Sequence, residues 1–251
     1  MSYLFESYNF NTITADVSPF YAFEQSDSFG RVVALLLFFA SIFAWTIIVD
    51  KWLYTKGVHK QSKAALDFYY QNNNPISLFL NISTYKGPIH DISNAAISSL
   101  AKICNVNNET MIENLANNGF PSELSSSDFA QVKAATEGAV DKEIMKLEER
   151  LGILSSIVSA SPFLGLLGTV WGVMMAFTGM AIEGNVDIKA IAPGISGALL
   201  TTVVGLIVAI PAVIGYNLLV NLVKKESVTM DNFAEDLISS VVAEKERMNN
   251  G

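Results

Sequence analysis

Three long uncharged stretches interrupt an otherwise polar chain. They span residues 32–49, 151–182 and 190–223, and none of them contains Asp, Glu, Lys, Arg or His. The hydrocarbon core of a bilayer is about 30 Å thick, so an apolar run of roughly 18 residues or more is long enough to cross it as a helix. Helices of soluble proteins carry a polar face, which the two longer stretches lack. The pattern predicts an all-α integral membrane protein with three transmembrane helices.

The second span is preceded by a segment whose pattern predicts a helix with one apolar face and one charged face. From Asp128 onward, apolar positions recur every three or four residues, which is the repeat of an amphipathic helix. These positions are Phe129, Val132, Thr136, Val140, Ile144, Leu147, Leu151 and Leu154. Ser126 or Ser127 is the predicted N-cap. Because no Gly–Pro break precedes the span, we expect one helix from about Asp128 to Ile182, roughly 80 Å long.

Shorter patterns organise the remaining polar regions. A stripe of Val228, Phe233, Leu237, Ile238 and Val241 predicts that the third helix also continues beyond its span. A helix is expected over Val58–Tyr70, and another short one ending near Gly119. We interpret the apolar stripes as surfaces that pack against each other, with the binding of a partner as the alternative.

The charges that flank the spans predict an orientation. The first thirty residues contain four acidic residues and no Lys or Arg, whereas basic residues follow the first and third spans and precede the second. The positive-inside rule then gives seven segments. They are an outer N-terminal segment 1–30, transmembrane helix 31–50, a cytoplasmic helical loop 51–150, transmembrane helix 151–182, an outer turn 183–189, transmembrane helix 190–223 and a cytoplasmic tail 224–251.

Composition agrees with a membrane protein and argues against other classes. The chain is 51% hydrophobic and 16% charged, with a mean hydropathy of +0.36. Its net charge of −8, with no dense basic patch, argues against nucleic-acid binding. The single cysteine, Cys104, lacks neighbours at metal-ligand spacing, and His59 and His90 are isolated along the sequence and expected on the surface. We therefore expect no enzyme activity, metal or cofactor.

Hydroxyl side chains recur at matching depths in the second and third spans. Thr169 lies seventeen residues before Val186, at the centre of the outer turn, and Thr202 lies sixteen after it. Thr201 is adjacent to Thr202, and Ser196 lies nearer the turn. A lone membrane threonine commonly bonds back to its own helix. Hydroxyl groups at the same depth on two adjacent helices, however, favour a polar track along a pore wall.

Small residues and prolines accompany these hydroxyls. Gly165, Gly168 and Gly172 predict a close approach of another helix, and Pro162, Pro193 and Pro211 remove backbone donors and can kink their helices. No Asp, Glu, Lys, Arg or His lies inside any span. Because proton pathways across membranes normally need an ionisable group, a channel built from this chain needs a carboxylate from another subunit.

Three sequence blocks at these positions resemble the TolQ and ExbB proton-channel family. They are SPFLGLLGTVWG at residues 161–172, APGISGALLTT at 192–202 and AIPAVIGYN at 209–217. The resemblance is specific across about Gly152 to Asn217. Family members commonly have an acidic residue where this chain has Gly197. The resemblance matches Thr169 and Thr202 to the family's pore-facing threonines. With the neighbouring Thr201, Ser196 and Gly197, they form the predicted pore-lining set.

The resemblance also implies an assembly and a role. It implies a homopentameric ring in the bacterial inner membrane, with a periplasmic N-terminus, a cytoplasmic C-terminus and long second and third helices. A dimer of single-span ExbD- or TolR-type partners inside the ring supplies the proton-carrying Asp, and a TonB- or TolA-like protein is a further partner. Proton motive force then energises outer-membrane transport or envelope integrity.

A second class of function stays open from the residues alone. The chain can be a non-conducting membrane scaffold that only holds a single-span partner. A secondary transporter is disfavoured by the small number of spans and by the lack of paired repeats. A flagellar stator, a distant relative, has four spans rather than three.

Overall fold

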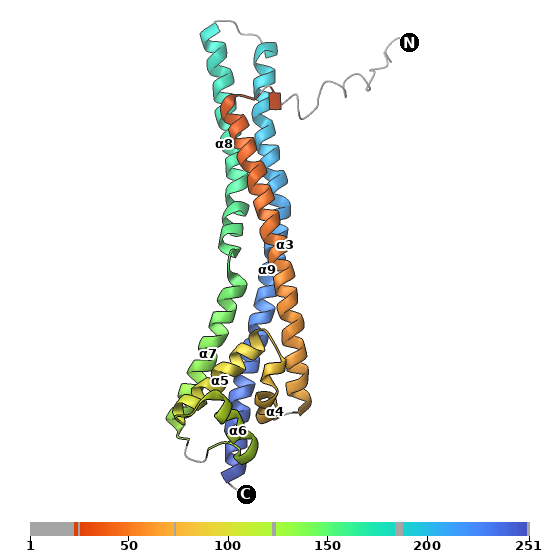
Figure 1. Ribbon diagram of the computed structural model, residues 1–251. Coiled ribbons are helices and arrows are strands. Elements are labelled where there is room, and N and C mark those ends of the chain that lie inside the picture. The colour runs from red at the N-terminus through yellow and green to blue at the C-terminus, as the bar shows by residue number, and fades with distance from the viewer. Residues whose placement is uncertain (1–22, 25, 73, 122–123, 184–187, 250–251) are drawn as a thin grey trace, which may run out of the picture. The chain divides into compact units, whose positions relative to one another are not determined.

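Every regular element that the structure describes is a helix. The computed structural model describes residues 23–24, 26–72, 74–121, 124–183 and 188–249. Three helical stretches are long and apolar enough to cross a membrane, and they cover Ser28–Asn72, Ser126–Ile182 and Ile191–Arg247 (Figure 1). The predicted all-α class with three candidate spans is confirmed at this level.

The chain divides into two compact units, each with its own internal packing. The first unit holds the described residues up to Ile48 together with Arg150–Asn217, and the second holds Val49–Glu149 and the residues from Leu218 onward. Helices α3 (Ser28–Asn72) and α9 (Ile188–Asn249) contribute to both units, whereas α8 (Leu151–Glu183) belongs to the first.

The first unit packs α8 and parts of α3 and α9 around a small apolar core. Val33 and Leu37 of α3 are buried against Val208 of α9, with Leu164 of α8 packed beside them. Large apolar side chains also cover its outer surface. Phe163 is 71% exposed, and Phe39 and Ile207 are exposed to a similar extent. An apolar exterior around an apolar core is what a membrane segment requires, because lipid is as apolar as the side chains.

The predicted continuous helix from Asp128 to Ile182 is wrong. Helix α7 covers Ser126–Glu148, and α8 begins at Leu151. Between them, Glu149 has a ψ of 134°, as in an extended strand, and Arg150 has a φ of +68°. A φ in this left-handed region commonly ends a helix. Neither residue is a Gly or Pro, so the local sequence carries no stop signal. The apolar spacing continues in phase across the break, which is why the pattern indicated a single helix.

Helix α3 is longer than predicted, whereas α9 continues beyond its span, as predicted. Helix α3 joins the first span to the helix expected over Val58–Tyr70, and α9 runs through both the third span and the tail. The outer turn expected at 183–189 is bounded by the end of α8 and the start of α9, and residues 184–187 lie outside the described residues. Most of the N-terminal segment 1–30 lies outside them too.

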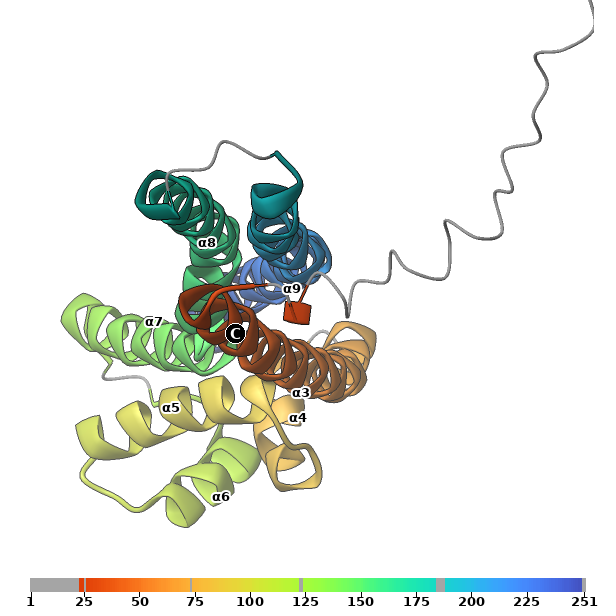
Figure 2. The ribbon, with the colours of Figure 1, turned by 90° about the horizontal axis from the view of Figure 1, so that it is seen from above.

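The second unit is a bundle of shorter helices packed on α7. After α3 come α4 (Pro75–Leu80), the 3-10 helix η1 (Ile82–Thr84), α5 (Pro88–Ile103) and α6 (Asn108–Asn118). Helix α5 lies along α7, with α6 beside α5 (Figure 2). Helix α6 ends at Gly119, which confirms the predicted stop. Buried side chains of α4, α5 and α6 form its core, among them Phe79, Ile92, Leu100, Met111 and Leu115.

The start of α7 and the apolar stripes differ in detail from the prediction. The N-cap is Ser125, whose hydroxyl accepts the Asp128 N–H while the Asp128 carboxylate accepts the Ser125 N–H in a capping box. Along α7, Glu143 is buried where Ile144 was expected. On α9, Val228 is 50% exposed, and Met230 is buried in its place beside Phe233.

Candidate functional site

Three threonine hydroxyls from α8 and α9 meet in the first unit. The Thr169 hydroxyl is within hydrogen-bonding contact of the Thr202 hydroxyl and lies 3.4 Å from that of Thr201. The predicted matching depth of Thr169 and Thr202 is therefore confirmed. We call Thr169, Thr201 and Thr202 the hydroxyl cluster.

The hydroxyl cluster converges on two backbone carbonyl oxygens. Thr201 Oγ1 lies 2.7 Å from the Ala198 oxygen and 3.0 Å from the Gly165 oxygen. Thr169 and Thr202 each lie 3.1 Å from the same Gly165 oxygen. A hydroxyl carries one proton and two lone pairs, so these contacts are alternatives among which the protons can redistribute. Each hydroxyl can also accept a hydrogen bond from a water or a carboxylic acid.

Glycines bring the two helices close enough for these contacts. A β-carbon at Gly165 would lie 2.8 Å from the Thr201 carbonyl oxygen, and one at Gly168 would lie 2.6 Å from the Thr201 hydroxyl. One at Gly172 would lie 2.6 Å from the Ala198 β-carbon. The small residues predicted to mark a close approach therefore lie on the contact between α8 and α9 of this chain, as small residues do in membrane helix pairs.

The predicted pore residues differ in exposure. Thr169 and Thr202 are half-buried, whereas Thr201 is 1% exposed and lies inside the contact between α8 and α9. Ser196 is exposed and Gly197 is buried. Only side chains with a free face can contact water or a partner, so Thr169, Thr202 and Ser196 are the accessible members of the set.

Ser26 and Asp27 also belong to this site, although they were not among the predicted residues. The Ser26 hydroxyl is buried and donates to the Gly197 carbonyl oxygen at 3.1 Å. The Asp27 carboxylate accepts the Gly30 N–H at 2.9 Å, as an N-cap of α3 does. A Ser–Asp–Ser run before an apolar stretch is a helix-start signature, and this signal could have placed the beginning of α3 at these residues.

The three prolines lie inside unbroken helices. Pro162 is in α8, and Pro193 and Pro211 are in α9. The Ser161 hydroxyl, next to Pro162, donates to the Ile157 carbonyl oxygen at 2.6 Å. A side-chain donor thus bonds a carbonyl in the turn where proline removes a backbone donor.

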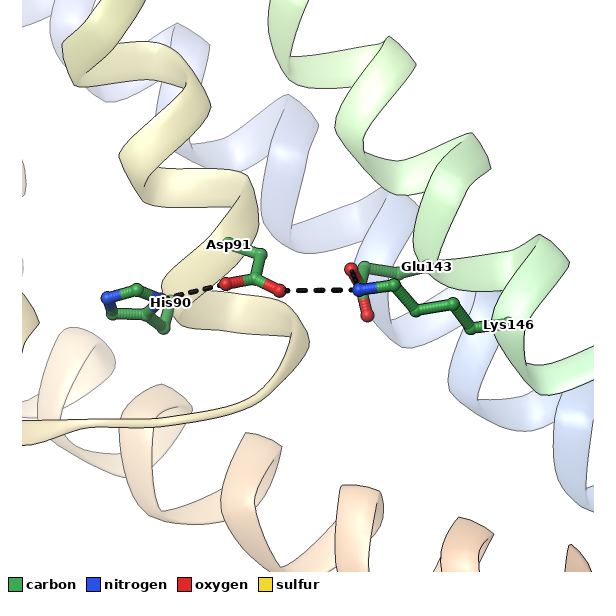
Figure 3. Close-up of polar contacts among 4 residues, drawn as sticks. All are labelled: His90, Asp91, Glu143 and Lys146. Carbon is green, nitrogen blue, oxygen red and sulfur yellow. Dashed lines mark hydrogen bonds and ion pairs between the residues drawn. The ribbon is translucent and has the colours of Figure 1, made fainter.

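A chain of charged groups holds α5 to α7 in the second unit. His90 Nδ1 lies 2.9 Å from Asp91, and the Lys146 amine lies 3.6 Å from the same carboxylate while also contacting the buried Glu143 (Figure 3). Burial alone raises the pKa of Asp91, but the hydrogen bonds with His90 and Glu143 and the charge of Lys146 outweigh it, and the pKa is lowered. The contact with Glu143 raises the pKa of Lys146.

These contacts have the character of structural ion pairs. His59 likewise pairs with the buried Glu226, at 2.6 Å, so each histidine contacts a carboxylate, His90 that of its sequence neighbour and His59 that of a distant residue. Across the part of the chain that the structure describes, no group of three or more His, Cys, Asp or Glu residues is arranged to hold a metal ion.

A groove of about 730 Å³ lies between α7 and α9 within the second unit. Its charged lining is Lys133, Glu137, Asp141, Asp231 and Glu235. Burial, and then the nearby charges of Asp141 and Glu235, raise the pKa of Asp231. The groove is therefore an acidic surface, separate from the hydroxyl cluster of the first unit.

The fold and the hydroxyl cluster define a class: an α-helical membrane protein with a polar contact between two of its three candidate spans. The chain belongs to the MotA/TolQ/ExbB proton channel family, whose model matches residues 107–232, half of the chain. This match includes α7, α8 and the spanning part of α9, and with them the hydroxyl cluster.

Relatives with two different names are similar to the chain. The biopolymer transport protein ExbB of Salmonella typhimurium is 26% identical over 232 residues, which cover 91% of this chain and 88% of that protein. The Tol-Pal system protein TolQ of Haemophilus influenzae is 26% identical over 208 residues, covering 82% and 85%. The ExbB of Pseudomonas putida is 28% identical over 203 residues, covering 80% of this chain but 56% of that longer relative.

Proposed function

We propose that several copies of this chain form the wall of a proton channel in a bacterial inner membrane. Together with a single-span partner of the ExbD or TolR type, this channel uses the proton motive force to energise outer-membrane transport or envelope integrity. The observation that carries the proposal is the hydroxyl cluster, which joins α8 and α9 inside the segment that matches the proton channel family.

The members of the hydroxyl cluster have different roles in this proposal. Thr201, buried and bonded to backbone oxygens, holds α8 and α9 together. Thr169 and Thr202 keep an accessible face and unused lone pairs, with which they bind water or the partner's carboxyl group. Each proton that crosses the membrane releases about 2.3 kcal/mol per 100 mV. Several protons per cycle are therefore needed for mechanical work on the partner.

The assembly we propose is a homopentamer around a partner dimer, with a TonB- or TolA-like protein as the recipient of the work. The second unit lies in the cytoplasm and the ends of the α8–α9 hairpin lie on the periplasmic side. The exposed apolar side chains of the first unit support this placement, since they suit lipid and neighbouring copies. Because relatives carry both ExbB and TolQ names, the proposal includes both roles.

Proton flux into liposomes tests the channel. The complex with its partner is reconstituted, and flux is driven by a potassium diffusion potential and followed with an internal pH dye. We expect Thr169→Val and Thr202→Val each to lower the flux by about tenfold, the effect of losing one hydrogen bond to a charged group. Thr178→Val is the matched control, because Thr178 bonds back to Met174 of its own helix at 2.8 Å.

Two outcomes would overturn this proposal. Equal flux in wild type and both valine variants would remove Thr169 and Thr202 from the conduction path. An absence of flux from an assembled wild-type complex would favour the alternative, a non-conducting scaffold for a single-span partner. Native mass spectrometry of the purified ring measures the number of copies, for which we expect five.

A further inference from the structure

The beginning of α3 lies against the α8–α9 hairpin close to the hydroxyl cluster. The buried Ser26 hydroxyl bonds the Gly197 carbonyl of α9, and the Phe29 ring lies 4.8 Å from the Trp171 ring of α8. A β-carbon at Gly30 would lie 3.6 Å from the Thr201 methyl group. Contacts to both helices therefore fix this end of α3.

These contacts place the Asp27 carboxylate beside the hairpin. Asp27 is half-buried, and its Oδ1 lies 3.9 Å from the position of a β-carbon at Gly172. Helix α8 continues for eleven residues beyond Gly172, to Glu183, a length of about 16 Å at 1.5 Å per residue. The carboxylate thus lies well below the ends of α8 and α9, which extend past the start of α3 in Figure 1.

The hairpin residues that these contacts name are uncharged. Gly172 of α8 faces the Asp27 carboxylate, and the neighbouring Ser26 and Gly30 lie against Gly197 and Thr201 of α9. The neighbouring charged residues of its own segment are Glu24 and Arg31, and the Arg31 guanidinium donates to the Glu24 carbonyl oxygen. Asp27 therefore adds a carboxylate to a hairpin whose own spanning segments contain no Asp, Glu, Lys, Arg or His.

We propose that Asp27 is a proton-binding carboxylate that this chain itself contributes next to the hydroxyl cluster. The proposal rests on the proposed channel function and replaces the expectation that only the partner carries a titratable group. The step is the binding of one proton by the carboxylate, which becomes a neutral carboxylic acid, and its later release. A carboxyl group can accept the Gly30 N–H through one oxygen in either state. The helix start thus persists while the charge changes.

The test uses substitutions that keep the helix cap. Asn and Ser cap helices about as well as Asp does, so Asp27→Asn and Asp27→Ser remove the titratable group while preserving the start of α3. We expect both variants to assemble with the partner and to lower proton flux by about a hundredfold or more, the usual range for a lost proton-transfer group. Asp27→Glu should retain flux with a shifted pH profile. Glu24→Gln, an exposed carboxylate three residues away, is the matched control.

The outcomes separate this proposal from the channel itself. Wild-type flux and an unchanged pH profile in either Asp27→Asn or Asp27→Ser would overturn the role of Asp27 and leave the channel intact. A complex whose flux depends on Thr169 but not on Asp27 would likewise exclude Asp27 from the proton path. An inactive wild-type complex would instead contradict the proposed channel function. A purely structural role predicts that Asp27→Glu leaves the pH profile of flux unchanged, which also contradicts the proposal.

Discussion

At the scale of single residues, position in a contact decides what a side chain can do. Thr201 and Thr202 are neighbours in the sequence, yet Thr201 is enclosed between α8 and α9 while Thr202 keeps an accessible face. Helical geometry turns successive side chains by about 100°, so adjacent hydroxyls necessarily face different surroundings. This difference supports the proposal that Thr201 holds the helices together and that Thr202 contacts water or a partner.

Asp231 provides a prediction at this scale, because its pKa is raised in the acidic groove. Below its ordinary pKa of 3.8 the carboxyl is neutral in both the folded and the unfolded chain, and folding is then most favourable. As the pH rises through the raised pKa of the folded state, the folded chain must carry this charge near Asp141 and Glu235 and loses stability. Asp231→Asn should therefore stabilise the protein at pH 7 but not at pH 3.

The expected gain is small because the groove is open to solvent. We expect about a few tenths of a kcal/mol, the usual size of interactions between exposed charges. Thermal melting of the full chain in detergent at the two pH values measures it, with Asp67→Asn as a control at an exposed carboxylate of α3. A lower melting temperature for Asp231→Asn at pH 7 would contradict the direction of the pKa shift.

At the scale of elements, the contact between α8 and α9 depends on two facing glycines. A β-carbon at Gly165 would lie 3.3 Å from the Gly205 α-carbon, and one at Gly205 would lie 2.8 Å from the Ser161 carbonyl oxygen. The obstacle at each position is backbone, which cannot rotate away as a side chain can. Close backbone approach replaces hydrophobic burial as the basis of helix pairing in lipid.

We predict that Gly205→Ala separates the two helices. An added methyl group normally favours a helix, but here it meets the Ser161 carbonyl, and overpacking of this kind destabilises by about 1–3 kcal/mol. The melting temperature should fall, and the Thr169-dependent part of the proton flux should fall with it. Gly152→Ala is the control, because its β-carbon position has no described atom within 4 Å apart from its chain neighbours and the backbone of its own helix. Equal melting of the two variants would contradict a tight contact at Gly205.

The elements also separate what the sequence predicts from what it does not. Apolar length identifies the three candidate spans, and helix periodicity identifies α7, because burial in lipid or against a neighbour acts on every residue of a helix. The break at Arg150 depends instead on one backbone angle in a residue that is not Gly or Pro, and no composition signal accompanies it. The depth match of Thr169 and Thr202 follows from counting residues about the turn, whereas the contact of Ser26 with Gly197 needs the three-dimensional packing of α3.

At the scale of the whole molecule, the two units differ in the surface they present. The first exposes Phe, Leu, Ile and Val side chains, and the second exposes most of the charged residues. This division fits one unit in lipid and one in water. By the positive-inside rule, the flanking charges predict an orientation in which the second unit lies in the cytoplasm. The hydroxyl cluster and Asp27 then belong to the membrane part.

The single cysteine, Cys104 at the end of α5, makes this orientation measurable in the natural sequence. It is partly exposed and free, and burial together with the charge of Asp128 raises its pKa. Maleimide reacts with the thiolate, so labelling should be slow at neutral pH and faster at pH 8. An impermeant maleimide should label Cys104 in inverted inner-membrane vesicles and leave it unlabelled in intact spheroplasts.

A second variant makes the orientation test reciprocal. Cys104→Ser removes the native thiol, and adding Ser7→Cys places a new one in the N-terminal segment that the charge pattern assigns to the outer side. This variant should be labelled in spheroplasts and protected in inverted vesicles. The reverse pattern in both proteins would invert the membrane orientation. In the predicted orientation, protons from the periplasm reach Asp27 before they reach Thr169 and Thr202, and an inverted orientation would reverse this order.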